Sequence, residues 1–502
     1  MEYGLLNTVS VMKKFSSALL WLTASEIIFN IAAYVVHSVA GRILGPADYG
    51  RYGLVVTLTT MVIVLIGNGI PTTMAKYLSE VLEQNPKNIP AIKRQAARLQ
   101  VIIIGGITVI FFLLAPAIAW ALRDASLTPL FQLSALIIPA FAAASFYHHY
   151  FTGLHLFKLQ AIVKIVRSIA RVGFIALAAI FFGLNGAVGG YVLAPLVTFA
   201  AAILIDELYV KRRLGIGQQD ASHHFQSPAK TILAYAGPLT LFLVFYELLL
   251  TIDLYFVKAL LQDDHATGLY NAAITVGRIP YYLFAALAMI MLPAISKTTA
   301  ERNTEETTSL VRKALRLMIL LLFPMITLLV IYAEPILHLF YGNRYAGAEQ
   351  AMSIFAIGVG FLTVFYVLAF ALNGAGLVRV PMKLSFFGFI AMALLNFILI
   401  PRFGIEGAAL AAALTAAAIT IGILIYTQRH FSVRLSFRTL ALSLTASVIV
   451  VFLSRFLPHG TWSFLVSGAV LAAIYFALLR LAGELTNEDL APFAKLLKGR
   501  TP

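Results

Sequence analysis

The chain has 502 residues, of which 60% are hydrophobic and 12% are charged, and its mean hydropathy is +0.89. A soluble domain carries about 25% charged residues, so this composition excludes a soluble fold and requires the bilayer as solvent. The formal charge of +15 would suggest nucleic acid in a soluble protein, but membrane proteins collect Lys and Arg on the cytoplasmic side, so we expect no nucleic-acid partner. The absence of cysteine excludes disulfides and thiolate chemistry.

A helix needs about 20 apolar residues to cross a hydrocarbon core of about 30 Å. The chain contains 14 such runs, at about residues 16–40, 52–72, 99–122, 128–151, 161–183, 184–208, 231–261, 268–298, 313–341, 350–373, 382–402, 405–427, 438–457 and 461–482. The sequence therefore predicts an all-α integral membrane protein with about 14 transmembrane helices. The first run lacks a small-residue cleavage site, so we interpret it as a span rather than a signal peptide.

Lysine and arginine are unevenly distributed around these spans. Most of the 37 lysine and arginine residues lie before the first span, after even-numbered spans or in the tail, and few follow odd-numbered spans. The positive-inside rule then places both termini in the cytoplasm, in agreement with an even number of spans. The stretches 73–98 and 486–499 are predicted to form short amphipathic helices on the cytoplasmic side.

The chain contains an internal duplication. The segment Gly183–Ala187 recurs as Gly404–Ala408, 221 positions later, and Glu26 recurs as Glu247 at the same offset. Many secondary transporters consist of such repeats, with the substrate site between the two halves. The duplication predicts a transporter with its site on the pseudo-symmetry axis.

The repeat boundaries predict four regions. These are an N-lobe of spans 1–6 at 1–208, a polar cytoplasmic linker at 209–230, a C-lobe of spans 7–12 at 231–430, and spans 13–14 with a cytoplasmic tail at 431–502. Each lobe has an even number of spans, so the two six-helix repeats are expected to be parallel. The linker contains His223-His224, which we interpret as solvated rather than metal-binding.

Four stretches carry a family resemblance, namely Gly41–Tyr52, Gly268–Pro293, Leu372–Gly376 and Asn396–Ala412. Their order and spacing resemble the polysaccharide-transporter (oligosaccharide flippase) family of the MOP exporter superfamily. The resemblance implies a MOP/MATE-like fold and the flipping of a lipid-linked (polyprenyl-diphosphate) oligosaccharide across the cytoplasmic (inner) membrane for cell-surface polysaccharide biosynthesis. The partners it implies are this glycan, membrane lipids and polysaccharide polymerase or assembly proteins.

Charges inside spans are costly and are therefore candidates for function. Arg278 lies near the middle of span 8, just before Pro280, and its forked guanidinium suits a diphosphate. The alternative for Arg278 is a structural ion pair with Glu247 or Asp253. Three carboxylates are candidates for coupling transport to H+ or Na+, namely Glu247, Glu26 and Asp253. The alternative for the two glutamates is a structural hydrogen bond. The alternative for Asp253 is a gate or a charge in the external vestibule.

Further substrate-binding candidates lie closer to the membrane surfaces. Arg167 and Arg171 share one face of span 5 with Lys164 and could attract a diphosphate, or could form an ordinary positive-inside cluster. Arg42 and Asp48 flank the Gly45-Pro46 turn on the outer side, where they could form pairs across the lobes when the outside closes or form a simple loop salt bridge. Sugar stacking is a candidate role for a set of aromatic side chains, which are His148, His149, Tyr150, Tyr281 and Tyr282.

Other functional classes receive less support from the sequence. The chain contains no G-x-x-x-x-G-K-[ST] and no H-E-x-x-H motif, so we expect no enzyme, cofactor or metal site and infer that an ion gradient, the membrane potential or substrate removal drives transport. A multidrug or cation antiporter of the same superfamily predicts an acidic, apolar cavity. A lipid II flippase would need a cavity rich in arginine along span 1, where this chain has Glu26 and His37 instead. A membrane-embedded polymerase or ligase is the remaining alternative.

Overall fold

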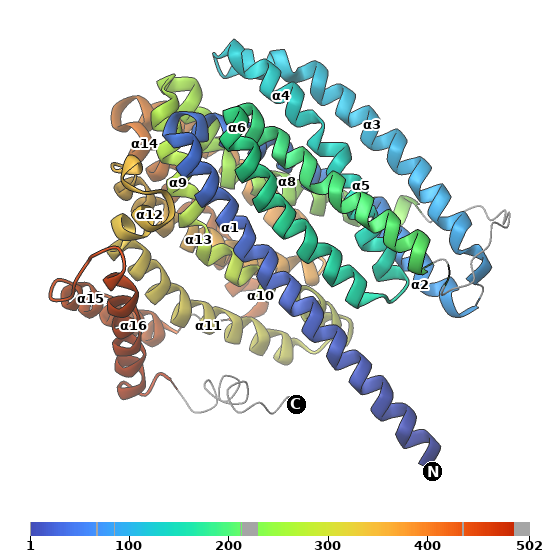
Figure 1. Ribbon diagram of the computed structural model, residues 1–502. Helices are drawn as coiled ribbons and strands as arrows, with labels where there is room; N and C mark the ends of the chain where they lie inside the picture. Colours follow the sequence, from blue (N-terminus) through green and yellow to red (C-terminus); the bar gives the residue numbers. More distant parts are fainter. Residues whose placement is uncertain are drawn as a thin grey trace. The chain divides into compact units, whose positions relative to one another are not determined.

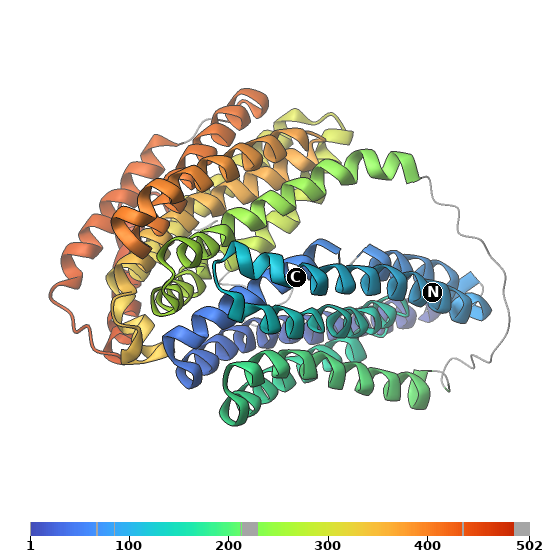
Figure 2. The same ribbon diagram turned by 90° about the horizontal axis from the view of Figure 1, so that it is seen from above.

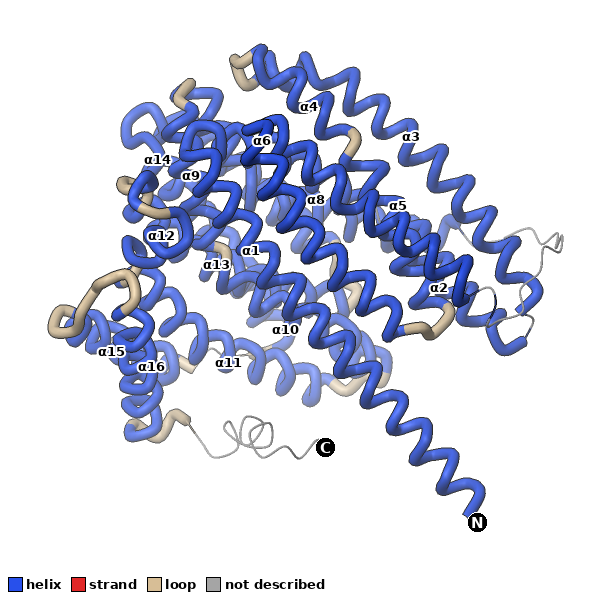
Figure 3. Tube along the Cα trace, in the orientation of Figure 1, coloured by secondary structure: helices blue, strands red, loops and turns tan. Residues whose placement is uncertain are grey.

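The computed structural model describes residues 2–66, 69–84, 86–210, 212, 229–433 and 436–485. Within these residues all regular structure is helical (Figure 3), which confirms the predicted all-α class. Eleven helical segments are long and apolar enough to cross a membrane. Three of them change direction at an internal glycine and therefore count twice, which gives the predicted 14 crossings within the described residues.

The chain divides into two units, and the first consists of Met1–Ala229 together with Gln262–Gly268. Its helices are α1 (Glu2–Ile66), α2 (Gly69–Gln84), η1 (Pro86–Asn88), α3 (Ile89–Ala121), η2 (Ala125–Leu127), α4 (Thr128–Ala135), α5 (Ile137–Gly153), α6 (Phe157–Ile205) and η3 (Asp206–Val210). The long helices α1 and α6 lie side by side (Figure 1). This contact brings together the candidate residues of spans 1 and 5.

The second unit consists of Lys230–Leu261 and Leu269–Pro502. Its helices are α8 (Ala229–Leu261), most of α9 (Asp264–Gly277), α10 (Ile279–Ala300), α11 (Thr304–Ile331), α12 (Ala333–Tyr341), η4 (Asn343–Tyr345), α13 (Glu349–Gly374), α14 (Arg379–Phe431), α15 (Phe437–Ser454) and α16 (Ser463–Leu481). Helices α13 and α14 lie side by side in the yellow-to-orange part of Figure 2.

The duplicated glycine motif forms the same turn in both units. Gly183 has φ 57° and ψ −136°, and Gly404 has φ 58° and ψ −135°, a left-handed conformation that glycine adopts without steric cost. After the turn the chain packs back on itself so closely that a Cβ on Gly186 would meet the carbonyl oxygen of Ala178, 1.8 Å away. The repeat position, Gly407, has the same relation to Leu399 at 2.3 Å. These matching hairpins confirm the predicted repeats.

Three predicted spans are interrupted within their length, and prolines explain where. Helices α4, α9 and α11 end at Ala135, Gly277 and Ile331, and a proline follows four, three and four residues later, respectively. A proline donates no backbone hydrogen bond, and its ring clashes with the carbonyl four residues earlier, so a regular helix ends at that point. These three spans therefore contain backbone carbonyl groups that accept no hydrogen bond from the proline positions of their own helices.

The stretch predicted as one amphipathic helix, 73–98, is divided differently in the structure. Its first part belongs to α2, and its second part is the beginning of α3, which continues directly into the third span. Pro86 and Pro90 explain the division, because proline favours the first turn of a new helix. Most of the predicted linker, including His223-His224, and the predicted helix 486–499 lie outside the described residues.

Spans 13 and 14 are attached to the second unit by a buried carboxylate. Glu484 is 7% exposed, and its Oε1 accepts a 2.5 Å hydrogen bond from the Thr439 hydroxyl of α15. The same oxygen lies 3.4 Å from Nε of Arg316 on α11. One side chain thus connects the beginning of α15 and the end of α16 to a helix of the repeat.

Candidate functional site

Arg278 lies in the interruption between α9 and α10. Its Nη2 donates a hydrogen bond to the backbone carbonyl of Leu250, and its Cζ lies 5.9 Å from the centre of the Phe355 ring. Its Nε is buried and has no hydrogen-bond partner within the described residues. The guanidinium is therefore held by its neighbours while part of its donor fork remains unused.

Two carboxylates of α8 belong to the same unit as Arg278. Asp253 is fully buried, and its Oδ2 accepts a 2.6 Å hydrogen bond from the hydroxyl of Tyr270 on α9. Glu247 is half-buried, and its carboxylate makes no hydrogen bond or ion pair with any described residue. Within the described part of the chain no direct ion pair or hydrogen bond joins Arg278 to either carboxylate, although both lie within electrostatic reach of its charge.

Tyr281 belongs to a cluster of aromatic rings in the second unit. Its ring centre lies 5.7 Å from that of Tyr246 on α8 and 5.2 Å from that of Tyr366 on α13. Phe370 extends the cluster, 4.7 Å from Tyr366. Such rings offer apolar faces and phenolic hydroxyls together, a combination that suits a ligand with both apolar and polar parts.

Three cations of α6 surround one ring of α1 in the first unit. Lys164 Nζ, Arg167 Cζ and Arg171 Cζ lie 4.9, 5.3 and 5.0 Å from the centre of the Phe29 ring. The three residues share one helix face, as their spacing predicts. Each cation above a ring contributes about 0.5–2 kcal/mol, which offsets part of the repulsion between like charges.

One carboxylate faces this group of cations. Glu26 Oε1 lies 2.5 Å from Lys164 Nζ, and the Glu26 side chain is 60% exposed. Arg171 has two buried nitrogens, Nε and Nη2, without a hydrogen-bond partner within the described residues. The cluster of Lys164, Arg167 and Arg171 thus carries more positive charge than Glu26 neutralises, and it retains donors for an anionic ligand.

The remaining candidates are placed as follows. Arg42 is exposed and Asp48 is partly exposed, while the neighbouring Arg51 lies 3.8 Å from Asp264 within the first unit. The imidazoles of His148 and His149 bond locally, and His148 Nε2 lies 3.0 Å from Gln160 Nε2. Among the described residues no group of three or more His, Asp or Glu side chains could hold a metal ion.

Sequence reasoning missed the side chains that position these charges. Phe29 follows Glu26 by three residues, so a shared helix face was detectable from spacing alone. Tyr270 and Phe355 are different, because their contacts with Asp253 and Arg278 join helices distant in the sequence. No local pattern identifies such partners.

Two family models match the chain. The model of a family described as polysaccharide biosynthesis protein matches residues 17–299, which is more than half of the chain. The MatE family model matches residues 238–398. The first match contains all the charged candidates described above, which are Glu26, Lys164, Arg167, Arg171, Glu247, Asp253 and Arg278.

Several proteins resemble the chain at low sequence identity. Stage V sporulation protein B of Bacillus subtilis is 23% identical, over 95% of this chain and 97% of its own length. The putative O-antigen transporter of Shigella flexneri is 22% identical, over 56% of this chain and 65% of its own. The probable low-salt glycan biosynthesis flippase Agl15 of Haloferax volcanii is 22% identical, over 39% of this chain and 42% of its own.

Solved structures share the fold. The lipid II flippase MurJ in an inward closed conformation has a TM-score of 0.72 and 13% identity, covering 92% of this chain and 98% of its own. An inward-facing multidrug resistance MATE family transporter of the MOP superfamily has a TM-score of 0.68 and 14% identity, covering 83% of this chain and 98% of its own. These likenesses confirm the predicted MOP/MATE-like fold.

Proposed function

The chain belongs to the polysaccharide biosynthesis protein family, and from this membership we propose that it flips a lipid-linked oligosaccharide across the cytoplasmic membrane for cell-surface polysaccharide assembly. Its relatives named as an O-antigen transporter and a glycan biosynthesis flippase support this function. The chain is a multi-pass membrane protein, and we propose a transporter rather than an enzyme.

The observation that carries the proposal is the set of unused guanidinium donors within the spans. A buried donor without a partner costs about 1–3 kcal/mol, and for a charged guanidinium inside a span an anionic ligand would complete the bond. Arg278 has one such nitrogen and Arg171 has two within the described residues. Arginine forks bind pairs of anionic oxygens, and a polyprenyl diphosphate supplies them.

We assign the remaining substrate roles by chemistry. Arg167, beside Arg171 on α6, adds charge for the diphosphate, and Tyr281 offers a ring face to sugar or lipid. Arg42 is an exposed cation that could meet the diphosphate at the membrane surface. The lobes, with the boundaries predicted from the sequence, would alternate between states open to opposite sides.

Glu247 is the first candidate for coupling to an H+ or Na+ gradient. Its carboxylate is half-buried and makes no bond within the described residues, so a proton or Na+ can bind without displacing a partner. Asp253 already accepts a hydrogen bond from Tyr270, and Glu26 is paired with Lys164. They are therefore weaker candidates for the same role.

The distribution of lysine and arginine supports an orientation with both termini in the cytoplasm. In this orientation the diphosphate enters from the cytoplasmic leaflet, where such lipid-linked glycans are assembled, and leaves on the outer side. Polysaccharide polymerase or assembly proteins are the partners that would receive the glycan there.

The MatE match over residues 238–398 favours one alternative, a cation or multidrug antiporter. That alternative requires an acidic site for a cationic drug, and residues Glu247 and Asp253 lie in the matched region. The unused Nε donor of Arg278 lies there too, however, and it favours an anionic ligand.

Native mass spectrometry of the gently purified protein tests the proposal. We expect a co-purified polyprenyl-diphosphate glycan whose mass also identifies the sugar, and we expect Arg278→Ala to lose it. A lipid II mass would indicate a lipid II flippase instead. Bulk phospholipid alone, together with binding of organic cations, would contradict the proposal and favour the antiporter.

A further inference from the structure

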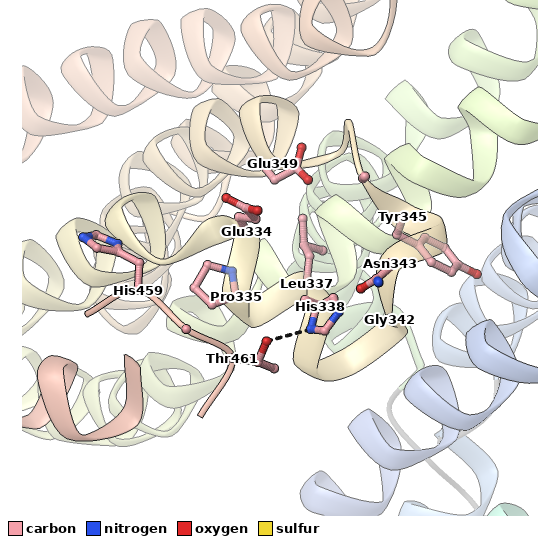
Figure 4. A pocket seen from close by; sticks show the side chains of 12 residues that line it. Glu334, Pro335, Leu337, His338, Gly342, Asn343, Tyr345, Glu349, His459 and Thr461 are labelled. Atoms are coloured by element: carbon pink, nitrogen blue, oxygen red, sulfur yellow. Dashed lines mark hydrogen bonds between the residues drawn. The ribbon is translucent and has the colours of Figure 1, made fainter. Parts of the chain in front are cut away.

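The second unit contains a pocket of about 430 Å³ remote in sequence from the charged groups described above (Figure 4). It is formed by α12, η4, the first residue of α13 and the loop between α15 and α16. That loop is held against α12 by the 2.8 Å hydrogen bond between Thr461 and His338 Nδ1, and the His459 ring lies 5.2 Å from the ring of Tyr332. Part of the pocket wall therefore comes from the loop between spans 13 and 14, which lie outside the repeats.

The lining of the pocket combines apolar and polar residues, and two of them are acidic. Glu334 and Glu349 contribute carboxylates, and His338 and His459 contribute imidazoles (Figure 4). The 12 lining residues include no lysine or arginine. A diphosphate would therefore be repelled here, whereas a neutral or positively charged group would be accepted.

The polar groups of the pocket remain available to a ligand. The Glu334 carboxylate makes no hydrogen bond with any described residue, and Glu349 accepts one bond, 2.8 Å from the backbone N–H of Gly347. His338 uses Nδ1 to bond Thr461 at 2.8 Å, which orients the ring and leaves Nε2 for another partner. Carboxylate acceptors and a ring nitrogen from separate elements thus line the same pocket.

The size and chemistry of this space match a sugar. Small-ligand pockets span about 300–1,000 Å³, and a pocket near the lower end holds about one or two sugar rings. Vicinal hydroxyls donate to carboxylates, and hydrogen bonds to charged acceptors are about twice as strong as neutral ones. Metal binding receives no support, since no group of three or more His, Asp or Glu side chains among the described residues could hold an ion.

We infer that this pocket binds a neutral or amino-bearing sugar residue of the transported glycan. The inference rests on the proposed function and on its orientation, in which the loops that follow α12 and α15 face the outer side. The pocket then holds the glycan after it has crossed, while the cationic groups act on the diphosphate. Sugar and diphosphate are recognised by different parts of the protein with opposite charge.

Saturation-transfer NMR on the full-length protein in lipid nanodiscs tests the inference. The probes are soluble glucose, galactose, glucosamine and N-acetylglucosamine. We expect transfer to at least one sugar, with binding weakened about tenfold or more by the double change Glu334→Gln and Glu349→Gln. Glutamine keeps an acceptor oxygen for the Gly347 N–H, so the local fold should persist.

Glu305→Gln is the matched control, because Glu305 is an exposed glutamate in the first turn of α11, away from the pocket. It should leave sugar binding unchanged. If the double variant fails to fold, Glu334→Gln alone is used, since its carboxylate has no partner within the described residues. Absence of transfer to every sugar, or equal transfer in wild type and the pocket variants, would overturn the inference.

Two further measurements separate this inference from the proposed function. Zn²⁺ binding that the double variant abolishes, without sugar binding, would identify a metal site and overturn the sugar assignment. Glycan export in cells is scored independently with Arg278→Ala. Export that needs Arg278 while no sugar binds the pocket leaves the flippase in place and overturns the sugar assignment. Sugar binding with normal export in Arg278→Ala removes Arg278 from the diphosphate site and leaves the sugar pocket in place.

Discussion

The two units carry the same glutamate in different chemical settings. Glu26 and Glu247 are 221 residues apart, yet Glu26 is paired with Lys164 and exposed, while Glu247 is half-buried and unpaired within the described residues. The cations differ as well. At the repeat positions of Lys164, Arg167 and Arg171, the second unit has Ser385, Gly388 and Met392, and near the repeat position of Arg278 the first unit has Thr60.

A duplicated tyrosine shows the same divergence. Tyr52 and Tyr270 occupy matching motifs, and both are fully buried. The Tyr270 hydroxyl donates to Asp253, whereas the Tyr52 hydroxyl has no hydrogen-bond partner within the described residues, and Ala32 occupies the repeat position of Asp253. The two units thus share the same arrangement of helices and motifs, but their charged residues lie on different helices. We infer that the units perform different parts of one transport cycle.

The largest expected effect is that of Arg278→Ala. Loss of two charge-assisted hydrogen bonds to a diphosphate, about 1.5 kcal/mol each, should reduce glycan export about 100-fold. Arg278→Lys keeps the charge but loses the fork and should give an intermediate rate. Arg312→Ala, at an exposed position of α11, is the control and should export normally. Normal export by Arg278→Ala with an intact thermal unfolding profile would remove this residue from the site.

Replacing the two glutamates separately tests whether only the unpaired one couples to an ion. Glu247→Gln should abolish the response of transport to pH and Na+, which for one proton is at most about tenfold per pH unit. Glu26→Gln should retain that response and cost under about 1 kcal/mol of stability, because an exposed ion pair is weak. Transport in proteoliposomes under imposed gradients measures both. An unchanged ion response in Glu247→Gln would exclude the coupling role.

The first unit's cations should matter less than Arg278. Arg171→Ala should lower export about tenfold, since Lys164 and Arg167 remain beside the same ring. Arg171→Lys should restore part of the rate. Binding of the lipid-linked glycan, measured by native mass spectrometry, should fall in parallel with export. If Arg171→Ala reduced protein stability but not glycan binding, the cluster would be a structural feature of the cytoplasmic side.

The duplicated tyrosines provide the smallest and cleanest test. Tyr270→Phe removes a donor from the buried Asp253 and should cost about 2 kcal/mol in unfolding free energy. Tyr52→Phe removes a buried hydroxyl that has no partner within the described residues, so it should be neutral or slightly stabilising. Unfolding in mixed micelles measures both. Equal costs would show that the two hydroxyls have equivalent surroundings and would weaken the comparison.

The sequence alone determined the membrane class, the number of crossings, the duplication and the family. These depend on composition, on the length of apolar runs and on recurring motifs, all of which are local or periodic properties. Gly183 and Gly404 illustrate this, because a tight reversal needs a glycine wherever the helices meet. The predicted helix 73–98 was misplaced because prolines set helix starts more sharply than apolar runs do.

Only the tertiary structure decided which charges have partners. Glu26 and Glu247 look alike in the sequence, and their difference depends on whether a cation from a distant helix reaches them. The partner of Asp253, the ring beneath Arg278 and the pocket between α12 and the α15–α16 loop likewise join segments far apart in the chain. Hydrogen bonds and ion pairs act over a few ångströms, and only folding brings such segments within that distance.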